Sequence, residues 1–164
     1  MKPYLFHSSF NANIILFIGI LLLLLLLCNQ SEARITTATE LSKVNLYADF
    51  GFHFAGQASI NLERQIYSGK KTTWYGRGGV GTAGIIMANG GFGALGAITM
   101  LTGKGNKHFE INGGTFIGKD TEHDEIFVYP LIDFGYRYQK PEGGFIFKAK
   151  LGFLGIGIGL GYAF

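Results

Sequence analysis

Apolar and other side chains alternate along most of the chain after residue 43, and a period of two is typical of β-strands. In the last ten residues, 155–164, every second position is aliphatic or aromatic and the positions between are Gly or Ala. One face of this strand is therefore apolar and the other is almost bare. A soluble sheet usually alternates apolar with polar residues, so the stretch is typical of a wall strand in a membrane barrel.

Similar alternation predicts seven further strands. We expect them at about residues 44–54, 58–67, 72–82, 94–102, 108–119, 126–139 and 145–153, joined by short turns rich in Gly, Lys and Asp. Residues 83–93 hold too many glycines to fix a register, and we interpret them as the end of one strand, a loop and the approach to the next. The prediction is an all-β fold: an eight-stranded antiparallel transmembrane β-barrel, in an up-and-down meander.

The faces opposite the apolar ones carry equal numbers of acidic and basic residues. These predicted interior charges are Asp49, Glu63, Arg77, Glu110, Asp133, Arg137, Lys148 and Lys150. Lys or Arg facing lipid at mid-membrane would cost ~2–4 kcal/mol, whereas opposite charges can pair inside a small barrel. Side chains just fill an eight-stranded barrel, so we expect a packed, charge-paired interior. Glycines of the last strand would leave room for the long side chains beside them.

A soluble sandwich or lipocalin-like barrel is the alternative, with these charges in water. That fold would have to bury the other face, including Phe145, Phe147 and Tyr136. The aromatic placement and the leader described next favour the membrane barrel.

Residues 1–33 have the layout of a secretory signal peptide. Lys2 precedes an apolar run at residues 14–27, and Ser31 and Ala33 place small residues before a cleavage site. The run is shorter than the ~20 residues that a spanning helix needs. We expect cleavage after Ala33, export, and one outer-membrane barrel domain at residues 34–164. Cys28 would leave with the leader, and the barrel would have no disulfide.

Composition and motifs give little sign of chemistry. The net charge of +3 is too small and scattered to argue for nucleic acid. The glycines at residues 76–81 match G-x-G-x-x-G, but no helix is expected after them. His53, His108 and His123 lack zinc-ligand spacing, and only His123 has acidic neighbours, Glu122 and Asp124. We expect no catalytic residue, no metal and no cofactor.

Three segments carry a family resemblance: residues 60–64 (INLER), 101–110 (LTGKGNKHFE) and 135–145 (GYRYQKPEGGF). They resemble small outer-membrane β-barrel proteins of Bacteroidetes-type bacteria. The resemblance implies an eight-stranded barrel with no established activity. The chain end is also similar to the assembly signal of outer-membrane proteins, on Gly159, Tyr162 and Phe164. It implies that the last strand binds the barrel assembly machinery by its edge.

The connections predict an orientation. Lys70, Lys71, Lys104, Lys107 and Lys140 lie in alternate turns, and Asp120, Glu122, Asp124 and Glu125 lie in the connection before residue 126. With both barrel termini in the periplasm, the lysine turns would be periplasmic and the acidic loop external. We expect a structural or interaction protein in outer-membrane lipid that acts through its external loops. The alternatives are a narrow channel for small solutes and an outer-membrane lipid-modifying enzyme using His53 or His123.

Overall fold

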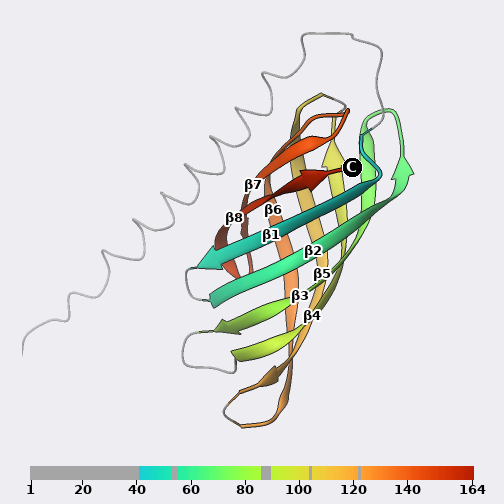
Figure 1. The fold of residues 1–164 in the computed structure, drawn as a ribbon. Helices are drawn as coiled ribbons and strands as arrows, with labels where there is room; N and C mark the ends of the chain where they lie inside the picture. Colours follow the sequence, from blue (N-terminus) through green and yellow to red (C-terminus); the bar gives the residue numbers. More distant parts are fainter. Residues whose placement is uncertain (1–40, 53–54, 86–89, 104, 122) are drawn as a thin grey trace, which may run out of the picture. The chain divides into compact units, whose positions relative to one another are not determined.

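The chain forms a closed antiparallel barrel of eight strands, as the alternation predicts. The computed structural model describes residues 41–52, 55–85, 90–103, 105–121 and 123–164 (Figure 1). The strands are β1 (Val44–Phe52), β2 (Ala55–Ser68), β3 (Thr72–Ile85), β4 (Gly90–Thr102), β5 (Lys107–Asp120), β6 (Ile126–Gln139), β7 (Gly144–Gly152) and β8 (Gly155–Ala163). The described residues include no helix long and apolar enough to cross a membrane.

The compact unit that contains the barrel spans residues 35–164. The expected signal peptide and its cleavage site at Ala33 lie outside the described residues, as do His53, Lys104 and Glu122.

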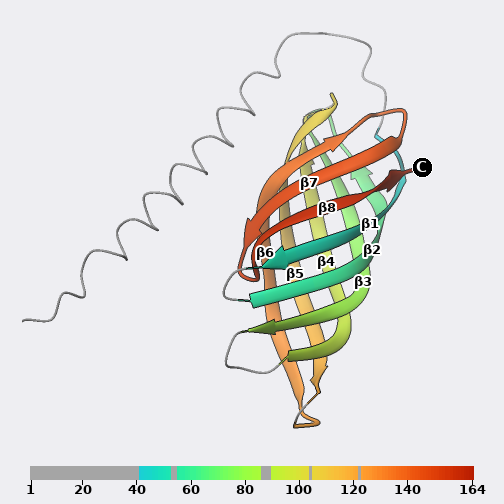
Figure 2. The ribbon, with the colours of Figure 1, turned by 60° about the vertical axis from the view of Figure 1, so that its left-hand side comes forward.

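Each strand pairs with its neighbours in the chain, and β1 closes the barrel against β8 (Figure 2). The closing register runs from Asn45↔Ala163 to Phe52↔Ile156. We call the end with the β2–β3, β4–β5 and β6–β7 turns the proximal end, and the opposite end the distal end. β1 begins and β8 ends at the proximal end. Because successive strands run in opposite directions, alternate connections lie at the proximal and distal rims.

Several strands are longer than predicted. β2 begins at Ala55, β3 continues to Ile85 and β4 begins at Gly90, so the glycine-rich stretch is largely strand. Cross-strand pairs such as Gly81↔Gly93 and Gly84↔Gly90 have no side chains to alternate, which hides the period. The register also shifts between Gln65 and Tyr67, a bulge that the sequence pattern does not reveal. β7 ends one residue before Phe153.

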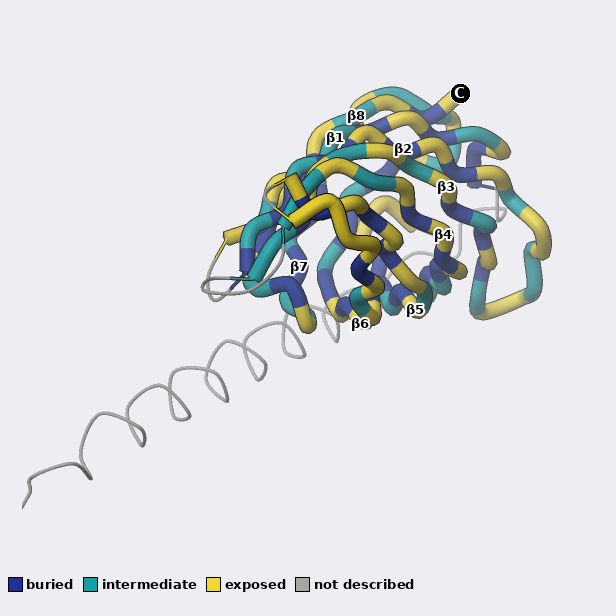
Figure 3. Tube along the Cα trace, turned by 90° about the horizontal axis from the view of Figure 1, so that it is seen from below, coloured by how far each residue is buried: buried dark blue, intermediate teal, exposed yellow. Residues whose placement is uncertain are grey.

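The two faces of the barrel wall differ sharply, and exposure alternates along each strand (Figure 3). Large apolar side chains point outward; in β8, Ile156, Ile158 and Leu160 are 45–50% exposed. The glycines between them face inward, and Gly157 and Gly159 are buried. The polar and charged side chains of the other strands also gather inside. The outer face therefore differs from that of a soluble barrel, whose outward side chains are mostly polar.

The interior has three layers along the barrel axis. The proximal layer is apolar and contains Leu41, Tyr75 and Leu101. The distal layer is a larger apolar cluster, made of Ala55, Ala83, Leu95, Ala97, Phe116, Phe127, Leu131 and Leu154. There the rings of Phe116 and Phe127 stack with 6.0 Å between centroids. The charged side chains lie between the two layers, so they are enclosed at both ends.

The interior charge network

The structure places all eight predicted interior charges inside the barrel. The most exposed of them, Lys150, has 6% of its surface accessible. They come from six strands, because each lies at an inward position of the alternation: Asp49 on β1, Glu63 on β2, Arg77 on β3, Glu110 on β5, Asp133 and Arg137 on β6, and Lys148 and Lys150 on β7. Four negative and four positive charges therefore share one enclosed space.

Arg137 is the centre of the proximal part of the network. Its Nη1 and Nη2 lie 2.7 and 2.9 Å from Glu63 Oε2 and Oε1, which is a bidentate pair across the barrel. Its Nε donates to Glu110 Oε2 at 2.5 Å. Lys148 Nζ lies 2.8 Å from the other oxygen of Glu110. Charge-assisted bidentate hydrogen bonds are among the strongest hydrogen bonds in proteins. Arg137 therefore binds the carboxylates of Glu63 and Glu110 at the same time.

Neutral side chains saturate the Glu63 carboxylate. The Tyr47 hydroxyl donates to Glu63 Oε1 at 2.5 Å, and the Thr99 hydroxyl donates to the same oxygen at 3.1 Å. Asn45 Nδ2 donates to Oε2 at 3.2 Å. The Tyr47 ring also lies 3.9 Å from Lys148 Nζ, a cation–π contact. Each carboxylate oxygen of Glu63 therefore accepts from a cation and from a neutral donor.

Asp49 organises the distal part of the network. Its Oδ2 lies 2.7 Å from Arg77 Nη2 and 3.1 Å from Lys150 Nζ. Lys150 Nζ is also 3.7 Å from Asp133 Oδ2 and donates to Gln57 Oε1 at 3.1 Å. Three of its buried atoms, Asp49 Oδ1, Arg77 Nη1 and Asp133 Oδ2, have no hydrogen-bond partner among the described residues, and the same is true of Lys148 Nζ, although it forms ion pairs.

Lys148 connects the two parts. Its Nζ lies 2.8 Å from Glu110 Oε1 and 4.0 Å from Asp49 Oδ2. The eight charges therefore form one continuous ion-paired array with no net charge. Apolar clusters lie on either side of the array along the barrel axis.

The glycines of β8 make room for this array. A Cβ at Gly159 would crowd Asp49 Oδ1 and would lie 3.3 Å from the Cβ and Cδ atoms of Lys148. At Gly157 it would lie 3.0 Å from Lys150 Cε. At Gly161 it would overlap Tyr47, an aromatic neighbour that the charge pattern does not predict. The bare face of β8 therefore lies against bulky side chains, as its alternation indicates.

Other interior polar residues carry no sequence signal of their role. Gln139 donates to Asn45 Oδ1 at 3.2 Å, and Asn112 donates to Glu110 Oε1 at 2.7 Å. His108 is buried at the proximal end, where Nδ1 and Nε2 lie 2.8 and 3.3 Å from the carbonyl oxygens of Thr102 and Gln139. Only their inward parity in the alternation could have located them.

The other motifs in the sequence do not form a binding or catalytic site among the described residues. The G-x-G-x-x-G segment lies within β3, and the next element of the described chain is the strand β4. His123 is exposed in the distal β5–β6 turn, where its backbone N–H donates to Asp120 Oδ1 at 3.1 Å. No group of three or more metal-ligating side chains occurs in the part of the chain that the structure describes.

The residues of the expected assembly signal lie on both faces of the barrel end. Gly159 faces inward, whereas Tyr162 and Phe164 are exposed, with 5.0 Å between their ring centroids. Phe164 N–H donates to the carbonyl of Val44 at 2.8 Å, which extends the pairing of the last strand to β1.

No protein-family model matches the chain, and no match was found among curated proteins or solved structures.

Proposed function

We propose that the chain is an exported outer-membrane β-barrel protein with a structural or interaction role. The observation that carries this proposal is the inversion of the two faces: outward side chains are apolar while the interior holds eight buried charges. In water such an outer surface would be unfavourable, since monomeric soluble proteins rarely expose apolar patches larger than a few hundred Å². In lipid it is the expected lining of a barrel.

The outward aromatic residues support the same assignment. Tyr and Trp concentrate at membrane–water interfaces, where one part of the ring is apolar and the other is wet. Here Tyr67, Trp74, Tyr136, Tyr138 and Tyr162 lie near the proximal ends of their strands. The outward aromatics described toward the distal end are phenylalanines: Phe50, Phe52, Phe92 and Phe153. The proximal rim is therefore the better candidate for a headgroup level.

The leader layout and the family resemblance extend the proposal. A signal peptide at residues 1–33 would export the chain, and the Gly159, Tyr162 and Phe164 pattern would recruit the barrel assembly machinery. The resemblance to barrels of Bacteroidetes-type bacteria agrees with an outer-membrane destination. In that orientation the proximal turns face the periplasm, and the distal connections, including the acidic β5–β6 turn, face outward for interaction.

The interior favours a structural or interaction role over a solute channel. Ion-paired side chains lie buried in the centre, and the clusters around Leu101 and Phe116 place buried apolar side chains toward both ends. Planar-bilayer recordings test this point: we expect no sustained conductance, and stable single-channel steps would favour the channel. A lipid-modifying enzyme would need a reactive cluster, and lipid profiles of cells with and without the protein test that alternative.

Heat-modifiable gel migration tests the membrane barrel itself. We expect the protein folded in detergent or vesicles to migrate differently before and after boiling, because a closed barrel resists unfolding by cold detergent. The matched control is the same protein after denaturation in urea without refolding. Identical bands for folded and boiled samples would count against the proposal.

A further inference from the structure

The proximal rim is strongly basic, and its described cations form no ion pair with other described residues. Six basic side chains lie exposed at this end: Lys43, Arg64, Lys70, Lys71, Lys107 and Lys140. Glu142 is the one acidic side chain there among the described residues. None of the six basic side chains forms an ion pair with another described residue.

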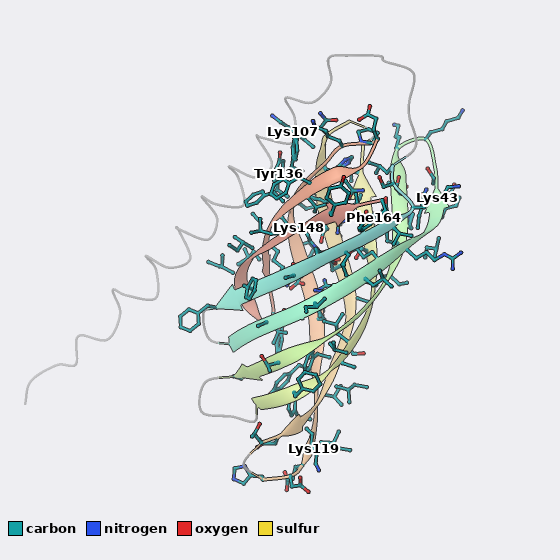
Figure 4. All side chains as sticks on the ribbon, in the orientation of Figure 1. Lys43, Lys107, Lys119, Tyr136, Lys148 and Phe164 are labelled. Carbon is teal, nitrogen blue, oxygen red and sulfur yellow. The ribbon has the colours of Figure 1, made fainter. Side chains whose placement is uncertain are left out.

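The distal rim has the opposite character. Asp120, Asp124 and Glu125 lie there, and Lys119, the one exposed lysine among the residues described at this rim, has its Nζ 2.5 Å from Asp124 Oδ1. Figure 4 shows Lys43 and Lys107 toward one end of the barrel and Lys119 at the other. The barrel is therefore electrically polarised along its axis, with free cations only at the proximal rim of the described chain.

Four of the cations belong to β1–β3 and their proximal connections, and we call them the basic corner: Lys43 just before β1, Arg64 on β2, and Lys70 and Lys71 in the β2–β3 turn. The carbonyl of Lys43 accepts from Gln65 N–H at 2.8 Å, which places Lys43 beside Arg64 on β2. Arg64 points outward and is paired in register with Val44 and Gly76. The β2–β3 turn, closed by Gly69 N–H donating to Thr72 O at 2.8 Å, presents Lys70 and Lys71 above it.

Along the barrel axis, the basic corner lies near the same level as the outward Tyr and Trp residues of the proximal end. Tyr67 and Trp74 are paired in register next to it and point outward. Arg64 points outward, and the outward residues next to it on β2 in the distal direction, Leu62 and Ile60, are apolar. A guanidinium matches phosphate oxygens in a bidentate manner, while Lys acts as a point charge. Interfacial Tyr and Trp sit at the same depth as lipid phosphates.

We propose that the basic corner binds anionic phospholipid headgroups of the leaflet at the proximal end. This inference rests on the proposed membrane location and adds a lipid preference to it. Lys and Arg near an anionic surface are attracted through its negative potential, and the attraction weakens with salt. The acidic distal rim would avoid such lipids, so the charge polarity also favours one orientation of the barrel.

Spin-labelled lipids measure the preference directly. The protein is reconstituted in phosphatidylcholine vesicles, and the association of spin-labelled phosphatidylglycerol is compared with that of labelled phosphatidylcholine. We expect phosphatidylglycerol to be favoured by about fivefold or more at low salt, from the size of the attraction per basic residue. The preference should fall when the salt is raised.

Two variants locate the site. The combined Lys43→Gln, Arg64→Gln, Lys70→Gln and Lys71→Gln variant should lose most of the preference, and the matched distal variant Lys119→Gln should keep it. An equal preference in the combined variant and the original protein would overturn the inference. Gel migration in pure phosphatidylcholine separates the two proposals. A folded barrel with no lipid preference defeats only the basic corner, and failure to fold in vesicles defeats the membrane location as well.

Discussion

Arg137 and Glu63 form a bidentate ion pair across the inside of the barrel, with both side chains fully buried. They lie on β6 and β2, strands that are not neighbours in the sheet. The pair therefore spans the interior and ties opposite walls together. Removing one partner of a buried pair leaves an uncompensated charge, which is far more costly than losing a surface pair.

We expect Glu63→Gln to destabilise the barrel by about 3–5 kcal/mol, since Arg137 would lose a bidentate carboxylate. Guanidinium unfolding of the protein in vesicles measures the change. The exposed carboxylate at the proximal rim gives the control, because Glu142→Gln should change stability by less than about 0.5 kcal/mol. Equal effects of the two substitutions would mean that the interior pair does not stabilise the fold.

Gly159→Ala tests whether β8 must be bare on its inner face. The added methyl group would crowd Asp49 and Lys148, and overpacking of this kind costs about 1–3 kcal/mol. Gly96 on β4 is the matched control, because a Cβ there meets no atom within 4 Å. The temperature at which the folded band disappears from gels should fall for Gly159→Ala and stay unchanged for Gly96→Ala. A fall for both would point to backbone effects.

Two isoleucines on β2 separate a membrane barrel from a soluble one. Ile60 and Ile66 are both 61% exposed and point outward, but Ile60 lies at mid-height and Ile66 lies beyond Arg64 toward the turn. In a bilayer, Ile60→Arg should cost ~2–4 kcal/mol and Ile66→Arg only ~0–1 kcal/mol. Chemical unfolding in vesicles gives both values. On a soluble surface both changes would be nearly neutral, so equal small effects contradict a membrane location.

Trp74 reports the environment of the proximal rim, because it is the only tryptophan in the sequence. Its side chain points outward and is 36% exposed in the isolated barrel. We expect its fluorescence to shift to shorter wavelength on insertion into vesicles. Lipids brominated near the headgroup should quench it more than lipids brominated at the chain end. Stronger quenching from the chain end would place the rim deeper than we propose.

The sequence was most informative where alternation was strong. In β7, Lys148 and Lys150 alternate with Phe147 and Ala149, so their inward direction could be predicted from parity alone. The same reasoning located all eight interior charges. It could not predict which charges pair, because Arg137 and Glu63 are brought together only by closure of the barrel.

The apolar layers at the ends of the interior were missed for a different physical reason. In the distal half of β6, Phe127 and Leu131 face inward while Val128 and Ile132 face outward. Both faces are apolar there, so hydrophobicity has no period to detect. The glycine pairs between β3 and β4 hid the strand ends in the same way, by having no side chains at all.

The pairing of Lys150 with Asp49 joins the seventh strand to the first, across a separation of 101 residues. Contacts of this range cost loop-closure entropy before they contribute to stability, so they slow folding. If the barrel inserts in lipid as we propose, an open sheet there would expose unpaired charges together with the free edges of β1 and β8. Insertion and closure should then occur together, and the ion pairs between strands should slow the reverse step.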